Sequence, residues 1–147
     1  MADLSRSGRA MGMSSPPAEE GSPVSVLVVD DQAVFRAAAR LVIDATPEFE
    51  LAGEADSGCH ALTAAAELHP DLVLLDVRMD EMDGIATAQR LTVEQPGSVV
   101  VLLSIEEPPN LPAGVASCGA AELLRKRDFG PAVLRRVWGE HGRAEQS

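Results

Sequence analysis

The sequence is short of cysteine, of lysine and of long hydrophobic runs. Its two cysteines, Cys59 and Cys118, lie far apart, and with three scattered histidines they form no recognisable zinc-binding pattern. No apolar stretch approaches the roughly 20 residues that a membrane-spanning helix requires. Residues 1–23 also lack the apolar segment of a signal peptide. These absences predict a cytoplasmic protein that does not insert into membranes.

Positive charge is also scarce. The 147 residues include 12 lysines and arginines against 23 aspartates and glutamates, which gives a formal net charge of −11. An acidic surface repels the phosphates of nucleic acids and of anionic membranes, so we expect no direct nucleic-acid binding. Lys126 is the only lysine. It can reflect chance in an arginine-rich composition, or it can mark a place where a compact ammonium group is required.

The length is sufficient for one domain. A hydrophobic content of 46% and a charged content of 24% are typical of a globular core with a solvated surface. The Ser-, Gly-, Pro- and Met-rich residues 1–23 predict a flexible tail, and residues 139–147 predict a second one. The domain is therefore expected over residues 24–138. No Gly-x-Gly-x-x-Gly motif is present, which leaves a dinucleotide-dependent enzyme without support.

Short apolar runs alternate with helical patterns through this domain. Apolar runs predict strands at 24–29, 72–75 and 99–103, a more polar segment predicts a strand at 49–55, and a short fifth strand is expected at 122–124. Apolar residues at helical spacing predict helices at 32–45, 57–68, 84–94 and 131–138. Repeated β-α units predict an α/β fold, a five-stranded parallel sheet with helices on both faces. Pro108, Pro109 and Pro112 interrupt the stretch before the last strand. The fourth helix is therefore expected to be short, late or mobile.

Polar residues follow four of the five predicted strands. Asp30 and Asp31 follow the first strand, Asp76 ends the third, Ser104 follows the fourth, and Lys126 lies just past the fifth. Ligands of an open parallel sheet bind beyond the carboxyl ends of its strands. Taken singly, each residue has an ordinary explanation, such as a helix cap or a solvated charge. Together they predict one site on a single edge of the sheet.

The residue types indicate what chemistry such a site supports. Three neighbouring carboxylates repel one another and favour a hard divalent cation such as Mg²⁺. Asp76 is then placed to act as a nucleophile toward a phosphoryl group, which would form an aspartyl phosphate. Lys126 would supply a positive charge to that group, and Ser104 a hydroxyl donor.

The stretches that carry these residues resemble the receiver domain of bacterial two-component response regulators. They are Val-Leu-Val-Val-Asp-Asp at 26–31, Asp-Leu-Val-Leu-Leu-Asp-Val-Arg-Met at 71–79, Met-Asp-Gly at 82–84, Val-Val-Leu-Leu-Ser at 100–104 and Gly-Ala-Ala-Glu-Leu-Leu-Arg-Lys at 119–126. Gly53-Glu54-Ala55 with Gly58 is most similar to receivers of LuxR/NarL-type regulators. The resemblance covers about residues 24–138, and the nine residues after it are too few for a DNA-binding output domain.

This resemblance implies roles for individual residues. Asp76 would be the phosphoacceptor, contacted in the phosphorylated state by Ser104 and Lys126. Asp31 and Asp76 would bind Mg²⁺ directly, and Asp30 would lie close by and contact it through a water molecule. The backbone carbonyl of Arg78 would complete the protein ligands of the metal. The flavodoxin-like strand order 2-1-3-4-5 is expected.

The resemblance also implies partners. It predicts a stand-alone response regulator that takes its phosphoryl group from a sensor histidine kinase or a phosphotransfer protein. Its signal would pass to a downstream protein target by direct contact, and formation of a homodimer is compatible with this role. Self-catalysed phosphorylation and dephosphorylation of Asp76 would be its only chemistry, so we do not expect an enzyme that turns over a metabolite.

Two alternatives arise from departures within these motifs. Asp80 stands where the family usually has proline, and Leu123 stands where it has an aromatic switch residue. A degenerate receiver that binds its partner without phosphorylation is the first alternative. The second alternative is a haloacid-dehalogenase-type phosphatase, which also uses an aspartyl nucleophile on a parallel sheet. It ranks lower because that family has a second aspartate two residues after the nucleophile, and Arg78 stands at that position here.

Overall fold

The computed structural model describes residues 22–79, 84–105 and 114–142 of the chain. Nearly all of the expected N-terminal tail lies outside these ranges. Five parallel strands form one sheet, in the order β2-β1-β3-β4-β5. They are β1 (Val24–Val29), β2 (Phe49–Ala55), β3 (Leu72–Asp76), β4 (Val99–Ser104) and β5 (Glu122–Arg125). The predicted flavodoxin-like order is confirmed.

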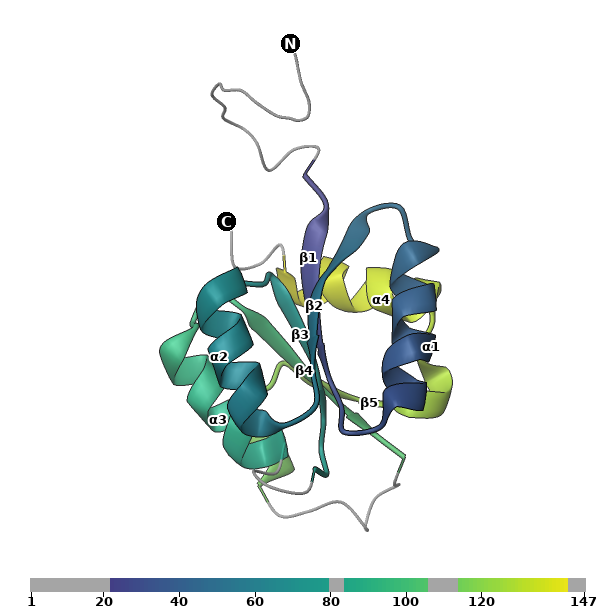
Figure 1. Ribbon diagram of the computed structural model, residues 1–147. Coiled ribbons are helices and arrows are strands. Elements are labelled where there is room, and N and C mark those ends of the chain that lie inside the picture. Colours follow the sequence, from purple (N-terminus) through teal and green to yellow (C-terminus); the bar gives the residue numbers. More distant parts are fainter. Residues whose placement is uncertain (1–21, 80–83, 106–113, 143–147) are drawn as a thin grey trace, which may run out of the picture.

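Helices cover both faces of the sheet. They are α1 (Ala33–Asp44), α2 (Gly58–Leu68), α3 (Gly84–Glu94) and α4 (Pro131–Val137). Figure 1 shows α1 and α4 on one face and α2 and α3 on the other. Two helix starts follow from local chemistry. The Ser57 hydroxyl accepts a hydrogen bond from the His60 amide at 3.1 Å and caps α2, and Pro131 opens α4, where no backbone donor is required.

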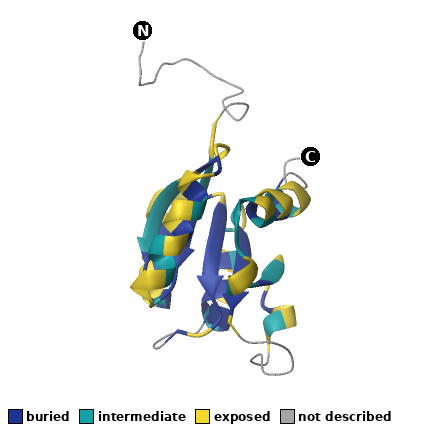
Figure 2. Cartoon of the chain, turned by 90° about the vertical axis from the view of Figure 1, so that its right-hand side faces the viewer, coloured by how far each residue is buried: buried dark blue, intermediate teal, exposed yellow. Residues whose placement is uncertain are grey.

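The central strands are buried on both faces, and Figure 2 shows them as the dark blue middle of the domain. Alternate residues of each strand enter two separate cores. Leu27, Val73 and Leu102 pack under α2 and α3, while Val28 and Leu74 pack under α1 and α4. This double burial explains why the strands are continuous apolar runs in the sequence. The buried polar side chains of the described residues are Asp30, Thr46, Asp76, Thr87 and Ser104.

The region between β4 and β5 departs from the regular β-α pattern, as its prolines predicted. Residues 106–113, which include all three prolines, lie outside the described residues. The part that is described contains a single short turn of 3-10 helix, η1 (Val115–Ser117). Gly114 and Gly119 flank it with positive φ angles of 92° and 96°, a conformation that glycine adopts without steric cost. The helix labelled α4 is thus the one expected at 131–138.

The C-terminal end of the domain extends further than the sequence indicated. A helical turn, η3 (Trp138–Gly142), continues α4, whereas residues 139–147 were expected to be a tail. The turn is tied to β5, because Nε2 of His141 lies 2.9 Å from a Glu122 carboxylate oxygen. Gly142 is buried against the Trp138 ring. Residues 143–147 lie outside the described residues.

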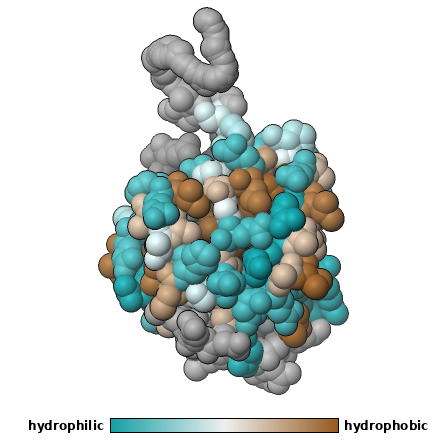
Figure 3. Space-filling model, viewed as in Figure 1, coloured by the Kyte–Doolittle hydropathy of each residue, from teal (hydrophilic) through white to brown (hydrophobic). Residues whose placement is uncertain are grey.

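Among the residues that the structure describes, few large apolar side chains are exposed. Val34 and Leu41 of α1, Val93 of α3 and Ile105 after β4 are the most exposed of them. Figure 3 shows apolar areas separated by broad polar ones on the face that Figure 1 presents. Within the part of the chain that the structure describes, no helix is both long enough and apolar enough to cross a membrane.

Gly84 lies where α3 meets the chain that leaves β3, and it provides a test of this packing. An added Cβ would fall onto the carbonyl oxygen of Asp76 and come within 2.7 Å of the Val77 Cα. We expect Gly84→Ala to lower the free energy of unfolding by about 1–3 kcal/mol, because backbone atoms cannot move aside cheaply. Gly97→Ala is the matched control, since a Cβ there meets nothing within 4 Å. Urea denaturation of both variants measures the effect, and equal stabilities would contradict it.

Candidate functional site

Three carboxylates meet at the carboxyl edge of the sheet. Asp30 and Asp31 directly follow β1, and Asp76 is the last residue of the neighbouring strand β3. One carboxylate oxygen of each lies within 4.8 Å of those of the other two. Asp30 is 1% exposed and Asp76 is 7% exposed. The predicted clustering is therefore present, and two of its three members are removed from water.

Lys126 joins this cluster from the end of β5, the strand at the edge of the sheet. It is the first residue of η2 (Lys126–Asp128), directly after β5. Its ammonium nitrogen Nζ lies 2.6 Å from Oδ2 of Asp30 and 3.6 Å from Oδ1 of Asp76. The side chain is only 12% exposed. The lone lysine of the sequence is thus the cation of the acidic site and not part of a solvated basic run.

An aromatic pair holds Lys126 in this position. Nζ lies 4.7 Å from the centroid of the Phe35 ring, a distance at which the ring quadrupole attracts a cation. The Phe35 ring packs in turn against Phe129, with centroids 6.3 Å apart. The sequence has only three phenylalanines, and one of them contacts the ammonium of its only lysine while a second packs against the first. That scarcity is the signal that could have identified Phe35, which helical periodicity alone does not single out.

Ser104 and Arg78 lie next to Asp76. In the pairing of β3 with β4, Asp76 stands opposite Leu103, so Ser104 is one residue further along the same edge. Ser104 is 3% exposed. The backbone N–H of Arg78 donates a hydrogen bond of 3.3 Å to Oδ1 of Asp76. The proposed ligand role of the Arg78 carbonyl stays a prediction, and Asp80 lies outside the described residues.

Burial and like charge raise the pKa of Asp76. Removal from water has the largest effect, and the Asp30 carboxylate adds to it, so that the pKa rises from 3.8 to about 6. The Lys126 ammonium and the Arg78 amide oppose this rise but do not cancel it. The site is therefore short of positive charge when Asp76 is ionised.

The donor set fits a small divalent cation. Oδ1 of Asp30 accepts a hydrogen bond of 2.8 Å from the Gln32 amide, whereas the buried Oδ2 accepts no well-directed hydrogen bond and only contacts the Lys126 ammonium. Together with Asp31 and Asp76 it offers the few carboxylate oxygens that Mg²⁺ takes, with room left for waters and phosphate oxygens. These observations support the predicted Mg²⁺ ligands Asp30, Asp31 and Asp76.

A second group of potential metal ligands lies at the opposite end of β5. Ligand atoms of Glu122, Glu140 and His141 also fall within 4.8 Å of one another. Here the guanidinium of Arg136 already pairs with both carboxylates, at 2.7 Å from Glu122 and 3.0 Å from Glu140. This group is an ion-pair network that attaches η3 to β5.

The fold and this site together define a class of protein. A 2-1-3-4-5 parallel sheet with an acidic cluster and a lysine at its carboxyl edge is the arrangement of a flavodoxin-like signalling domain. The family model described as the response regulator receiver domain matches residues 26–137. The chain therefore belongs to the response regulator receiver family of two-component signalling, and this assignment separates it from the dehalogenase-type phosphatases.

Relatives of known name support the assignment. The chain is 35% identical over 127 residues to protein-glutamate methylesterase/protein-glutamine glutaminase 2 of Anaeromyxobacter dehalogenans, covering 85% of this chain and 35% of the relative. It is 25% identical over 114 residues to the transcriptional regulatory protein DegU of Brevibacillus brevis, covering 78% of this chain and 48% of DegU. The chain thus spans between about a third and a half of these relatives.

A solved structure agrees in fold. The signal receiver domain of the putative response regulator NarL from Mycobacterium tuberculosis superposes with a TM-score of 0.71 at 32% identity, and the match covers 80% of this chain and 98% of that one. The receiver domain of Thermotoga maritima CheB gives a TM-score of 0.70 at 26% identity, with 80% and 95% covered. The predicted similarity to receivers of the NarL type is confirmed by the first of these.

The raised pKa of Asp76 predicts how metal-free stability depends on pH. The folded state holds the proton more tightly than the unfolded state, so this stabilisation is complete below about pH 4 and is lost as the pH rises through about 6. The difference amounts to roughly 3 kcal/mol at most. Denaturation is measured at several pH values with a metal chelator present. As the pH rises, the free energy of unfolding should fall more steeply for the wild type than for Asp76→Asn. Parallel curves for the two proteins would contradict the raised pKa.

The contact between Lys126 and Asp30 predicts competition between the lysine and a metal. Lys126→Met removes the ammonium that lies 2.6 Å from Oδ2 of Asp30, so we expect Mg²⁺ to bind at least about threefold more tightly to this variant. Arg127→Met is the matched control, because it removes the adjacent, exposed positive charge. Calorimetric titration measures both affinities. Weaker binding to Lys126→Met would show that the lysine does not occupy the metal's place.

Proposed function

We propose that this chain accepts a phosphoryl group on Asp76 from a phosphohistidine of a sensor histidine kinase or phosphotransfer protein, and that its phosphorylated form acts by contact with a downstream protein. One observation carries the proposal. Asp76 is a buried carboxylate at the end of a central strand, and two carboxylates and the only lysine surround it. Nothing about packing alone requires so much uncompensated charge at one point of the core.

In the proposed transfer, a carboxylate oxygen of Asp76 attacks the phosphorus atom. The O–P bond forms as the N–P bond of the phosphohistidine breaks, and the imidazole leaves with the electron pair and takes up a proton. A nucleophilic carboxylate must be ionised. With a pKa of about 6, Asp76 is mostly ionised at pH 7, so the burial that raises its pKa still leaves it reactive.

The neighbouring residues would neutralise the incoming charge. When Mg²⁺ is bound by Asp30, Asp31, Asp76 and the Arg78 carbonyl, it supplies positive charge to the phosphoryl oxygens. Lys126 is held within reach of Asp76, and its contact with Phe35 keeps its ammonium over the site and out of solvent. The Ser104 hydroxyl lies at the end of the neighbouring strand β4 and would donate a hydrogen bond to the phosphoryl group.

The surroundings of Ser104 support both access and signalling. A small pocket beside it is lined by Ile105, Arg125 and Arg127, so two basic residues border this side of the site. Ser104 is buried, whereas the next residue, Ile105, is 80% exposed. A phosphoryl group adds about 1.5–2 negative charges at pH 7. A shift of Ser104 toward that charge would therefore move an exposed apolar side chain on the surface, which a protein partner can read.

Phosphorylation by acetyl phosphate tests the acceptor directly. Incubation with Mg²⁺ should add one phosphoryl group to the wild-type chain, as measured by intact mass, and none to Asp76→Asn. Asp31→Asn is the informative control. It removes a proposed metal ligand and keeps the acceptor, so its labelling should be slower by about 10-fold or more but should still occur at high Mg²⁺.

Two results would change the conclusion. Label that persists in Asp76→Asn would place the acceptor at another residue. No label on the wild type, either from acetyl phosphate or from a phosphorylated donor protein, would favour the degenerate receiver, in which the acidic site has lost its phosphoryl chemistry and the chain binds its partner unmodified.

A further inference from the structure

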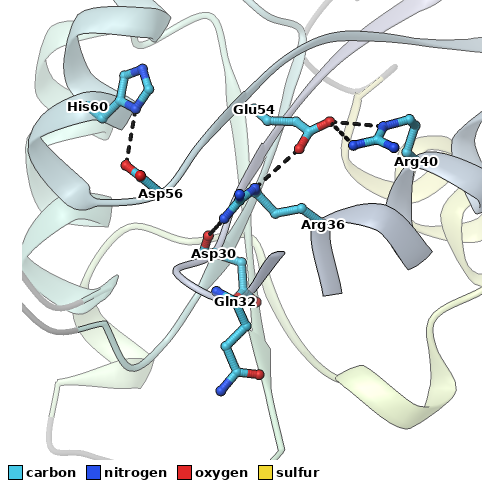
Figure 4. Close-up of polar contacts among 7 residues, drawn as sticks. All are labelled: Asp30, Gln32, Arg36, Arg40, Glu54, Asp56 and His60. Atoms are coloured by element: carbon cyan, nitrogen blue, oxygen red, sulfur yellow. Dashed lines mark hydrogen bonds and ion pairs between the residues drawn. The ribbon is translucent and has the colours of Figure 1, made fainter. Parts of the chain in front are cut away.

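The carbonyl group of Asp30 is held by an arginine that takes no part in the acidic cluster itself. Nη1 of Arg36, one turn into α1, donates a hydrogen bond of 2.7 Å to the Asp30 backbone oxygen. The Asp30 N–H donates to the Ala55 carbonyl at 3.0 Å. The peptide group after Asp30, which joins it to Asp31, is thus fixed through its oxygen at the point where β1 ends. Figure 4 shows Arg36 reaching this oxygen.

Arg36 is fixed in turn by Glu54 of β2. The Nε of Arg36 lies 3.2 Å from Oε1 of Glu54. The other carboxylate oxygen, Oε2, accepts two hydrogen bonds from Arg40, at 2.8 Å and 3.0 Å. The side chains of Arg36 and Glu54 are 21% and 23% exposed, whereas that of Arg40 is 47% exposed. Glu54 therefore holds two arginines, and in the structure Arg36 is the one that bridges it to Asp30 (Figure 4).

An irregularity in β2 places Glu54 where this contact is made. The pairing of β1 with β2 shifts by one residue between Val26 and Leu27, so that Val26 stands opposite Leu51 but Leu27 stands opposite Gly53. The extra residue changes the face to which the following side chains point. Glu54, paired with Val28, consequently faces α1, and Ala55 enters the core on the other side.

We propose that Arg36, held by Glu54, is a positioning residue for the metal site. By fixing the peptide between Asp30 and Asp31 it directs both carboxylates toward Asp76. The carbonyl at the end of β1 lies beyond the sheet's hydrogen-bonding ladder and before α1, and the Arg36 side chain satisfies it. A charged donor makes a short and directional bond there. The inference rests on the proposed Mg²⁺ site, and it assigns a part in that site to the edge strand β2.

An ordinary surface ion pair would have different consequences. If the network only stabilised the fold, Arg40 would matter at least as much as Arg36, because its bonds to Glu54 are shorter. Net charge also distinguishes the two explanations. Removing a positive charge close to three carboxylates should by itself tighten the binding of a divalent cation. Weaker binding after loss of Arg36, in a variant that folds, therefore indicates lost positioning.

Calorimetric titration of the full chain with MgCl₂ tests the proposal. We expect Arg36→Met to weaken Mg²⁺ binding by about 10-fold, the lower end of the range for residues that orient metal ligands. Arg40→Met, which removes the same charge from the same network, should leave the affinity unchanged or slightly tighter. Arg36→Lys keeps the charge but cannot span both partners in a planar fork, so its affinity should fall between those of the wild type and Arg36→Met.

The outcomes separate this proposal from the function on which it rests. Equal or tighter binding by Arg36→Met would overturn the positioning role alone, since the wild type would still bind Mg²⁺. A wild type that binds no Mg²⁺ would overturn the metal site and the positioning role together, while labelling of Asp76 would still test the acceptor. If Arg36→Met fails to fold by circular dichroism, the comparison of Arg36→Lys with Arg40→Lys replaces it, and equal affinities there would overturn the proposal.

Discussion

The repulsion between two buried carboxylates is the constraint on which the rest of this structure depends. Asp30 and Asp76 end neighbouring central strands and are almost completely removed from water. An isolated charge in that position would be very unfavourable, so each must find a partner. Lys126 meets part of this requirement through its contact with Asp30. Burial, together with the negative charge that Lys126 does not balance, raises the pKa of Asp76, and this charge leaves the site able to bind a further cation.

The fold brings these charges together by burying everything around them. The strands β3 and β4 are buried along their whole length and have no solvent-facing side on which a carboxylate could be hydrated, so their polar residues, Asp76 and Ser104, occur only where these strands end. The sheet order places β1 beside β3 and brings β5 near enough for a lysine side chain to reach across. Phe35 and Arg36 are neighbours on α1, and each contacts one partner of the ion pair between Lys126 and Asp30. Phe35 contacts the Lys126 ammonium, and Arg36 donates a hydrogen bond to the Asp30 carbonyl.

Much of this arrangement was predictable from the sequence. Unbroken apolar runs mark strands covered on both sides, and the strand ends therefore identified Asp30, Asp76, Ser104 and Lys126 before any coordinates. Other features leave no such pattern. The one-residue shift in the pairing of β2 with β1 has no counterpart in the sequence pattern that predicted the strand. The helical turn η3 contains two glycines, which normally indicate a break, and it is held by tertiary ion pairs instead.

We propose that the carboxylate cluster at the sheet edge binds a divalent cation so that Asp76 can receive a phosphoryl group. Localisation of the label is the most direct test of this proposal. The chain would be phosphorylated with acetyl phosphate and Mg²⁺, digested with protease, and the modified residue identified by tandem mass spectrometry. The account predicts a single phosphoryl group on Asp76. A phosphoryl group on Asp30, on Asp31 or on a histidine would contradict it.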